Sequence, residues 1–347
     1  MRKQRKQDHI DIAINTNDGP SANGFACIHL IHNSLPELDM DDIDLSCSFL
    51  GKKLKYPFVI NAMTGGIAEA LVINRELASL AAKLGMAMAV GSQTIAVNEP
   101  NLRDSFRVVR EENPDGVIIA NVGAGSDLTT AIQAVEMINA DALHLHFNVP
   151  QELAMPEGDR RFRGIIDNVM KITEKCPVPV VAKETGFGLS RESVARLFEA
   201  GVRFFDCGGQ GGSNFIAIES QRGGIFDDEL DDWGIPTAVS LAEMVYLQLP
   251  INIIASGGIR SAGEAAKALA MGADMIAMAG PLLKILVQQG VDELEQYLHY
   301  FLYRLQAVLL MTGSQNVNEL RQKPVLILGD TAERLRARNI DPIKWAN

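Results

Sequence analysis

Short apolar runs alternate with amphipathic segments along most of this chain. Eight runs rich in Val, Ile and Ala end in small or polar residues, and they cover residues 58–62, 87–91, 116–121, 142–148, 178–183, 203–207, 251–256 and 275–279. Apolar runs of this length are typical of strands that are covered on both faces. The pattern therefore predicts eight buried strands.

Helical patterns separate these runs, at residues 73–84, 127–138, 163–173, 191–200, 241–247 and 262–271. Strands that alternate with helices predict βα units, and eight such units in succession predict a closed (β/α)8 barrel, the TIM barrel of the α/β class. Residues 1–50 form an N-terminal extension, and extra helices follow the eighth strand. We expect one domain over residues 1–347.

The spacing between the sixth and the seventh predicted strand is larger than the others. The excess lies in residues 213–238, an insertion that contains Asp227, Asp228, Glu229, Asp231 and Asp232. A run of charges is usually a solvated loop. This run, however, follows the C-terminal end of a barrel strand, where the active sites of barrels are assembled. A lid over the site is therefore the second interpretation.

Composition narrows the class of protein. The chain of 347 residues is 47% hydrophobic, enough for a sizeable core, and its net charge of −11 argues against non-specific binding to nucleic acid. Four widely spaced cysteines without a C-x-x-C pair predict free thiols in a reducing compartment. We expect no signal peptide, because no apolar run follows the basic residues at the start, and there is no run of the ~18 apolar residues that a membrane helix needs. We expect a cytoplasmic protein without a membrane partner.

Glycine-rich loops follow the last three predicted strands. They read Cys207-Gly-Gly-Gln-Gly-Gly-Ser213, Ser256-Gly-Gly-Ile-Arg-Ser261 and Ala279-Gly-Pro281. Glycines let backbone N–H groups approach an anion closely, and barrels frequently bind phosphate with the loops after strands seven and eight. A single loop of this kind would indicate only a tight turn. Three of them at neighbouring strand ends predict a phosphate site.

A lysine ends the fifth predicted strand among apolar and small residues. Burying an unpaired ammonium is costly, so Lys183 either forms an ion pair with Glu184 or another barrel carboxylate, or places a positive charge beside an electron-accepting cofactor. Met63, Thr64 and Asn121 follow other strands and suit a flat ring. No G-x-G-x-x-G opens the first helix of a βαβ unit, which excludes a Rossmann-type site.

In this order, the motifs resemble the type 2 isopentenyl diphosphate isomerases, which are FMN-dependent barrels. The resemblance extends from about Arg5 to the C-terminal helices. It rests on Arg5-Lys-Gln-Asp-His9, Ala62-Met-Thr-Gly-Gly66, Gly91-Ser-Gln93, Asn121, His146-Phe-Asn-Val-Pro-Gln-Glu152, Phe162-Arg-Gly164, Lys183-Glu-Thr-Gly186, Gly208-Gly-Gln-Gly-Gly-Ser213 and Ser256-Gly-Gly258. The glycine loops are common to many FMN barrels. The R-K-x-x-H and H-x-N-x-x-Q-E strings are specific.

The resemblance implies a set of ligand-binding residues. FMN would be held by Met63, Thr64, Ser92, Asn121, Lys183 and Ser213, with its phosphate on Gly257, Gly258, Ala279 and Gly280. The diphosphate would be bound by Arg5, Lys6, Ser92, His146 and Asn148, with magnesium bridged through Glu152 and with Gln151 and His146 near the reacting carbons. Many members carry an arginine after Gly-Ser-Gln, whereas this chain has Thr94, so one diphosphate contact is absent or supplied elsewhere.

The resemblance also implies the chemistry. Isopentenyl diphosphate and dimethylallyl diphosphate would be interconverted by adding a proton at one carbon and removing one from another, a step of isoprenoid biosynthesis without net oxidation. Reduced FMN would act as the acid–base cofactor, and NAD(P)H would serve only to reduce it. The family further implies a homo-oligomer, a tetramer or an octamer, in which an N-terminal arm reaches a neighbouring subunit.

Three points stay open at the level of the residues. His144 and His146 face the same side of their strand, and we favour His146 for the site because it lies nearer the C-terminal end. Taken without the resemblance, the basic N-terminus that contains Arg5 is more typical of a frayed, solvated tail than of a binding segment. Cys207 is more typical of a buried packing residue than of a nucleophile.

Two other functional classes fit parts of the pattern. An FMN-dependent 2-hydroxy-acid oxidoreductase would need a histidine base and an arginine near the loop after strand six, and that loop has neither. A flavin- or phosphate-binding sensor or scaffold would not need Gln151 and Glu152 beside a histidine and an asparagine at the catalytic mouth. The sequence therefore favours an enzyme.

Overall fold

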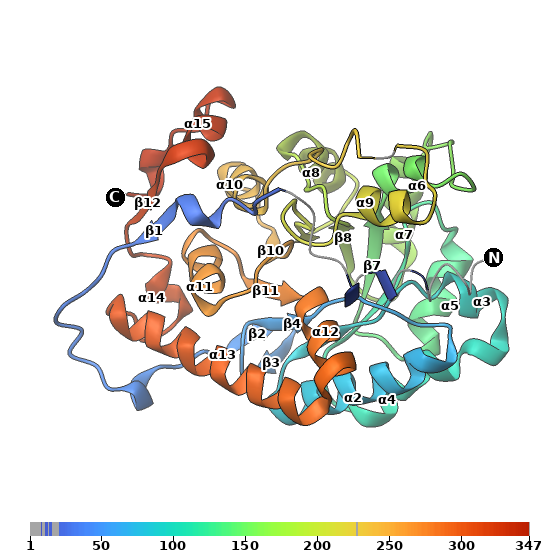
Figure 1. The fold of residues 1–347 in the computed structure, drawn as a ribbon, viewed down its shortest axis with the longest axis horizontal. Coiled ribbons are helices and arrows are strands. Elements are labelled where there is room, and N and C mark those ends of the chain that lie inside the picture. Colours follow the sequence, from blue (N-terminus) through green and yellow to red (C-terminus); the bar gives the residue numbers. More distant parts are fainter. Residues whose placement is uncertain (1–7, 9–10, 13, 16–20, 227, 347) are drawn as a thin grey trace.

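The computed structural model describes residues 8, 11–12, 14–15, 21–226 and 228–346. Its centre is a closed barrel of eight parallel strands that neighbour one another in chain order (Figure 1). The strands are β4 (Phe58–Ile60), β5 (Ala87–Ala89), β6 (Ile118–Gly123), β7 (Ala142–Phe147), β8 (Val180–Glu184), β9 (Phe204–Asp206), β10 (Asn252–Ala255) and β11 (Met275–Met278). The predicted (β/α)8 fold is confirmed, and each predicted strand overlaps an observed one.

At least one helix follows every barrel strand, and short irregular segments separate some of these elements. In chain order they are α2 (Ala68–Leu84), α3 (Thr94–Asn98), η3 (Pro100–Leu102), α4 (Asp104–Glu112), α5 (Leu128–Met137), α6 (Val149–Ala154), α7 (Ile165–Lys175), α8 (Arg191–Glu199), α9 (Phe215–Gln221), α10 (Thr237–Tyr246), α11 (Ala262–Ala270) and α12 (Gly280–Gln289). Side chains at every second strand position pack against these helices in the main core, as Phe58, Ile60, Met88 and Ile118 do.

The alternate strand positions fill the barrel itself. Val59, Ala89, Ile119 and Val181 belong to a separate apolar cluster, and a hairpin of β2 (Cys47–Phe49) and β3 (Lys52–Leu54) contributes Phe49 to it. The Phe49 ring meets the Phe204 ring edge-on, with centroids 6.0 Å apart. Apolar side chains fill the end of the barrel next to this hairpin. The polar residues that end the strands lie at the opposite end of the barrel.

The chain on either side of the barrel forms a joint outer layer. Strand β1 (Ile28–Leu30), flanked by η1 (Phe25–Cys27) and η2 (Met40–Asp42), pairs antiparallel with β12 (Val325–Ile327), far away in the sequence (Figure 1). The C-terminal part adds α13 (Val291–Met311), α14 (Val317–Leu320), α15 (Gly329–Ala337) and η4 (Pro342–Trp345). The side chain of Arg338, just after α15, donates to the buried carboxylate of Glu243 on α10 at 2.7 Å.

The insertion at residues 213–238 is partly ordered secondary structure. It contains α9, whose Ile216 packs with Ala154 of α6 and with Phe187 in a small apolar cluster. The backbone N–H of Ile225 also donates to the carbonyl of Ala154 at 3.1 Å. These contacts hold the first half of the insertion against α6, and whether the segment moves as a lid stays a prediction. No helix in the described part of the chain is long and apolar enough to cross a bilayer.

Candidate active site

A layer of polar side chains lies inside the barrel, next to the apolar plug. Side chains two residues apart on a strand face the same side, so Asn61, Lys183 and Ser256 continue the interior rows that start at apolar residues of the plug. The full layer comprises Asn61, Asn121, His144, Lys183, Asp206 and Ser256. All of these except Lys183 are buried, and their polar atoms bond to neighbouring side chains or backbone, except for the two ring nitrogens of His144, which have no hydrogen-bond partner among the described residues.

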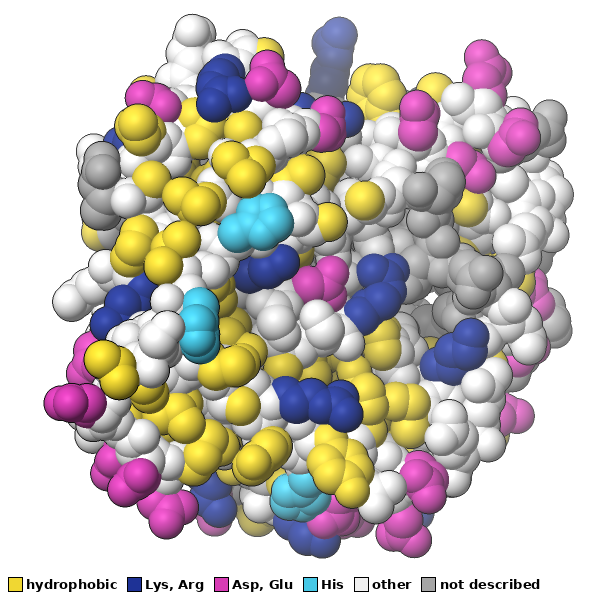
Figure 2. Space-filling model, turned by 60° about the vertical axis from the view of Figure 1, so that its left-hand side comes forward, with side chains coloured by type: hydrophobic (Ala, Val, Ile, Leu, Met, Phe, Trp, Pro, Cys, Tyr) yellow, Lys and Arg dark blue, Asp and Glu magenta, His cyan; other side chains and the backbone are white. Residues whose placement is uncertain are grey.

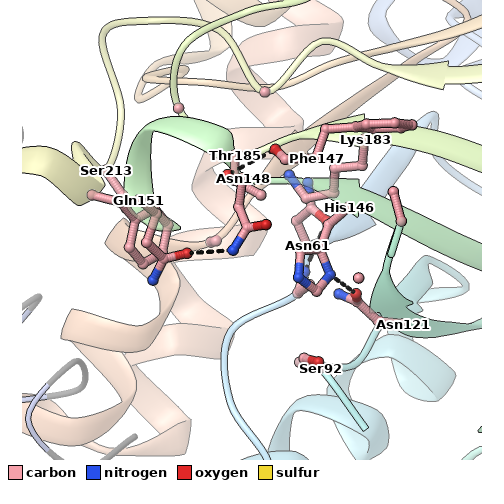
Figure 3. A pocket seen from close by; sticks show the side chains of 18 of the residues that line it. Asn61, Ser92, Asn121, His146, Phe147, Asn148, Gln151, Lys183, Thr185 and Ser213 are labelled. Atoms are coloured by element: carbon pink, nitrogen blue, oxygen red, sulfur yellow. Dashed lines mark hydrogen bonds between the residues drawn. The ribbon is translucent and has the colours of Figure 1, made fainter. Parts of the chain in front are cut away.

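A cavity of about 730 Å³ opens above this layer. This volume lies within the range of roughly 300–1,000 Å³ typical of sites for small molecules and cofactors. Side chains from several strand ends converge on it, as the close-up in Figure 3 shows. The late loops reach it through Ser213, Gly257, Gly258, Ala279 and Gly280.

The late glycines form part of the cavity wall because they have no side chain. A Cβ on Gly257, whose φ is +108°, would lie 2.1 Å from the Gly209 carbonyl oxygen, and one on Gly258, whose φ is +74°, would lie 2.1 Å from the Gly211 carbonyl oxygen. A Cβ on Gly212 would meet the backbone nitrogen of Gly258 at 2.7 Å. The loops after β9 and β10 therefore pack backbone against backbone, which leaves main-chain groups along this part of the cavity.

The end of β7 supplies a connected polar set. The Nδ1 atom of His146 lies 2.8 Å from Oδ1 of Asn121 on the neighbouring strand β6 (Figure 3). Helix α6 starts directly after β7, so its first turn stays at the mouth of the barrel. The Asn148 amide donates to Gln151 Oε1 at 3.2 Å and to Glu152 Oε1 at 2.9 Å. Oε2 of Glu152 accepts from the Asp159 N–H at 2.8 Å.

These bonds fix the direction of three side chains that line the cavity, namely Asn148, Gln151 and Glu152. The amide of Gln151 is held from its other end as well, because its Nε2 donates to Oε1 of Glu219 at 3.3 Å. Glu219 is fully buried on α9 and also bonds to Arg222. Arg222 in turn lies 3.3 Å from Asp8 and 3.6 Å from Glu157, so it links the N-terminal segment to the site.

The cavity fits a flavin mononucleotide on three observations. The hydroxyl Oγ1 of Thr64 is buried on its wall without a hydrogen-bond partner among the described residues, which leaves a donor for a ligand. The ammonium of Lys183 lies at the inner end, where it meets the negative charge that a flavin acquires on reduction. The glycine loops supply close backbone approach for a phosphate.

No preformed metal centre is visible in the described part of the chain, since no three His, Cys, Asp or Glu side chains there are grouped to hold an ion. Glu152 is a single carboxylate on the cavity wall. Magnesium usually keeps several waters and is held by one or two carboxylates together with substrate phosphates. The residues therefore fit an ion that arrives with a diphosphate and not a resident one.

The structure brings most of the predicted site residues together. Those that line the one cavity are Met63, Thr64, Ser92, Asn121, His146, Asn148, Gln151, Glu152, Lys183, Ser213, Gly257, Gly258, Ala279 and Gly280. Thr94 also lines it, with its hydroxyl 3.3 Å from that of Ser92. Arg5 and Lys6 lie outside the described residues.

The structure bears on three alternatives that the sequence left open, at Lys183, at His144 and at Cys207. Lys183 does contact a barrel carboxylate, because its Nζ lies 3.6 Å from Oδ2 of Asp206, and it reaches Glu184 only at the backbone carbonyl. His144 is fully buried and does not line the cavity, unlike His146. Burial raises the pKa of the Cys207 thiol to about 12, so this cysteine stays protonated and packs at the strand end.

Four residues near the site were missed at the level of the sequence: Asn61, Asp206, Glu219 and Arg222. The signal for the first two was present, since Asn61 and Asp206 are the polar residues that end interior rows of β4 and β9. No pattern in the sequence indicates Glu219, because a charge on a short helix in a polar insertion is usually solvated. Its role follows only from the packing of α9 against α6.

Comparison with known proteins gives the class first. Residues 160–326 match the family of FMN-dependent dehydrogenases. Two solved structures share the fold: a mandelate oxidase variant with an FMN adduct (TM-score 0.68, 17% identity, covering 92% of this chain and 96% of that one) and a lactate oxidase of Pediococcus acidilactici (TM-score 0.70, 15% identity, covering 94% and 93%). The fold and the cavity thus define an FMN-dependent (β/α)8-barrel enzyme.

Relatives of higher identity give the family. The chain is 48% identical to the isopentenyl-diphosphate delta-isomerase of Symbiobacterium thermophilum, over 100% of this chain and 98% of the relative. It is 48% identical to the enzyme of the same name from Moorella thermoacetica, over 97% of both chains. The chain belongs to the isopentenyl-diphosphate delta-isomerase family. The resemblance that the sequence motifs indicated is confirmed.

Proposed function

We propose that this chain interconverts isopentenyl diphosphate and dimethylallyl diphosphate with reduced FMN as its acid–base cofactor. The observation that carries the proposal is the juxtaposition, in one cavity, of a flavin-sized pocket over Lys183 and the polar set His146, Asn148, Gln151 and Glu152. The first part suits the cofactor and the second suits an anionic substrate. Full-length relatives that are named for this reaction support the assignment.

The proposed cofactor residues fall into two groups, one for each end of FMN. We assign Met63, Thr64, Ser92, Asn121, Lys183 and Ser213 to the ring system, and the loops with Gly257, Gly258, Ala279 and Gly280 to the phosphate. Bound in its reduced form, FMN supplies the proton transfer at the two carbons of the alkene. NAD(P)H is the proposed reductant and is needed only to generate that form.

The substrate residues act on the diphosphate. Ser92, His146 and Asn148 offer neutral or positive hydrogen-bond donors on one wall of the cavity, and we assign the diphosphate to them together with Arg5 and Lys6 of the N-terminal segment. Glu152 is the proposed ligand of a magnesium ion that the diphosphate carries in. Its carboxylate is already oriented by Asn148 and by the Asp159 N–H. Anchoring at this end leaves the hydrocarbon end to lie over the flavin.

The remaining task of the chain is to orient the alkene and to exclude water. Met63, Met155, Phe215 and Ile218 line the cavity and suit a five-carbon chain. We assign the side chain of Gln151 to the reacting carbons, because Asn148 and Glu219 fix its amide from both sides. An amide that is fixed in this way positions the substrate without competing for a proton. It thereby helps to hold the reacting atoms in one geometry.

A 2-hydroxy-acid oxidoreductase is the second candidate, favoured by the solved structures that share the fold. Their identities of 15–17% show the fold alone. The loop after β9 has no histidine or arginine in residues 207–214, where such an enzyme would need them. The homo-oligomer and the cytoplasmic location expected from the sequence stay predictions.

Turnover separates the candidates. Purified chain is incubated anaerobically with isopentenyl diphosphate, FMN, dithionite and magnesium, and dimethylallyl diphosphate is scored by proton NMR. Product that depends on FMN supports the isomerase. Bleaching of bound FMN by L-lactate or mandelate, without formation of dimethylallyl diphosphate, would instead assign the chain to the hydroxy-acid enzymes.

A further inference from the structure

A fully buried carboxylate lies directly beneath the cavity. Asp206 is the last residue of β9, has no exposed surface, and belongs to the interior polar layer. It does not line the cavity itself. Four of its partners do, so Asp206 can act on a bound ligand through them.

The contacts of Asp206 come from four other strands or strand ends. Its Oδ2 accepts from Nδ2 of Asn61 at 2.8 Å and lies 3.6 Å from Nζ of Lys183 and 4.0 Å from Nε2 of His144. Its Oδ1 accepts from the hydroxyl of Ser256 and from the N–H of Gly208, the latter at 3.3 Å. The four that line the cavity are Asn61, Lys183, Gly208 and Ser256.

These partners identify Asp206 as an ionised acceptor. An amide, a hydroxyl and a backbone N–H donate to its two oxygens, which is the pattern of a carboxylate that has no proton to give. The neighbouring His144 does not supply a charge, because burial lowers its pKa to about 3 and keeps it neutral. Glu184 directs its carboxyl group to the N–H groups of Phe187 and Gly188, away from this cluster.

The positive charge at the inner end of the cavity is therefore half of an ion pair. A lone ammonium would stabilise a negative ligand with the field of a full charge. A pair with charges 3.6 Å apart acts as a dipole, whose field is weaker and falls off faster with distance. Together with the Glu184 carbonyl, which accepts from Nζ at 3.1 Å, the carboxylate fixes where the ammonium of this long side chain sits.

We propose that Asp206 is a positioning residue that, by holding and partly balancing Lys183, sets how strongly the site favours reduced over oxidised FMN. This inference rests on the proposed function, because it takes FMN to be the occupant of the cavity. The proposed chemistry needs a reduced flavin that returns unchanged after each turnover. A balanced ion pair keeps the potential of the flavin below the value that an unopposed lysine would give.

The test is the reduction potential of FMN bound to the purified chain, measured by anaerobic spectroelectrochemical titration without substrate. D206N keeps the shape of the side chain and removes its charge, so the potential rises. We expect at least a tenfold increase in the ratio of reduced to oxidised flavin at a fixed ambient potential, which corresponds to about 30 mV for a two-electron couple. K183M shifts the potential the opposite way.

The coupling to Lys183 is tested by the double variant. In the K183M background, D206N is expected to shift the potential by less than half of its effect in the wild type, because the part of the effect that comes from releasing Lys183 is lost and only the direct field of the carboxylate remains. C207A is the matched control, since Cys207 is the buried, uncharged neighbour of Asp206. In C207A, the ratio of reduced to oxidised flavin at a fixed ambient potential is expected to stay within threefold of the wild-type value.

Three results would overturn the inference. One is a D206N potential equal to that of the wild type with FMN bound. Another is a D206N shift that is just as large without Lys183. If D206N loses FMN, the potential of D206S, which leaves room for water, is measured instead. The third result is loss of FMN from both D206N and D206S while C207A retains it, which would give Asp206 a purely structural role. A chain that shows the shifts but makes no dimethylallyl diphosphate contradicts the proposed function only.

Discussion

The imidazole of His146 is held by Asn121, whose Oδ1 lies 2.8 Å from its Nδ1. In this contact the Nδ1–H donates to the Asn121 oxygen, so Nε2 is the ring nitrogen that would meet a diphosphate, and it donates there in the protonated, imidazolium form. The two residues lie on adjacent strands, with His146 opposite Gly123, so the backbone register fixes the contact. The ring is thereby oriented before any substrate binds.

The first prediction concerns this oriented ring. H146A removes a hydrogen bond to a charged diphosphate, which is typically worth about 1.5–3 kcal/mol. We expect KM for isopentenyl diphosphate to rise by about tenfold or more, with a smaller effect on kcat, in steady-state assays with reduced FMN. H29A, which changes an exposed histidine on β1 outside the barrel, is the control and keeps the wild-type KM. An unchanged KM in H146A would remove His146 from the diphosphate site.

The second prediction concerns the phosphate loop of FMN. G258A forces a side chain into a backbone with φ +74° and against the Gly211 carbonyl oxygen, so the loops after β9 and β10 separate. We expect FMN affinity, measured by fluorescence quenching on titration, to fall at least about tenfold, a loss of about 1.4 kcal/mol. G263A is the control, because a Cβ there has no neighbour nearer than 3.9 Å. Equal affinities would place the phosphate elsewhere.

The third prediction concerns pH. Burial raises the pKa of Glu184 to about 8, and the N–H groups of Phe187 and Gly188 offset this only in part. The folded state keeps the proton that the unfolded state releases near pH 4.3, so stability falls as pH rises from about 4.3 to about 8, by up to about 1.4 kcal/mol per pH unit. Below and above this window Glu184 contributes no slope.

E184Q removes the titration and keeps an oxygen that accepts both N–H groups. Urea unfolding of the wild type and of E184Q at a series of pH values from 5 to 8.5 checks this. The free energies of unfolding are expected to diverge with rising pH in favour of the variant. Parallel curves would show that the carboxyl group ionises normally.

The fourth prediction concerns the C-terminal layer. Arg338 donates to Glu243, whose side chain is only 2% exposed, and also to the exposed Glu192. R338A leaves the Glu243 carboxylate buried without its cation, and such losses cost about 3–5 kcal/mol. R336A is the control, because Arg336 pairs with Glu333 on the surface and such pairs are worth about 0–1 kcal/mol. Similar denaturation midpoints for both variants would contradict the assigned role of Arg338.

The barrel and its polar mouth could be predicted because they depend on local pattern. Apolar runs buried on both faces mark each barrel strand, and the polar residues that end them, such as His146 and Lys183, must meet at one end of the barrel. The pairing of β1 with β12 and the docking of α9 on α6 could not be predicted. They depend on packing between segments that are distant or weakly patterned, which no local periodicity records. An ion pair of Lys183 with Glu184 or another barrel carboxylate was one of two interpretations of the sequence, and the actual partner, Asp206, was not identified.

In the proposed reaction the reduced flavin is an acid–base cofactor and is not consumed. The most direct test is an anaerobic time course of dimethylallyl diphosphate by proton NMR, with the chain loaded with oxidised FMN and then with FMN reduced once by a stoichiometric amount of dithionite. We expect negligible product before reduction and many turnovers per flavin afterwards without further reductant. Equal rates with oxidised and reduced FMN, or one equivalent of reductant used per product, would contradict it.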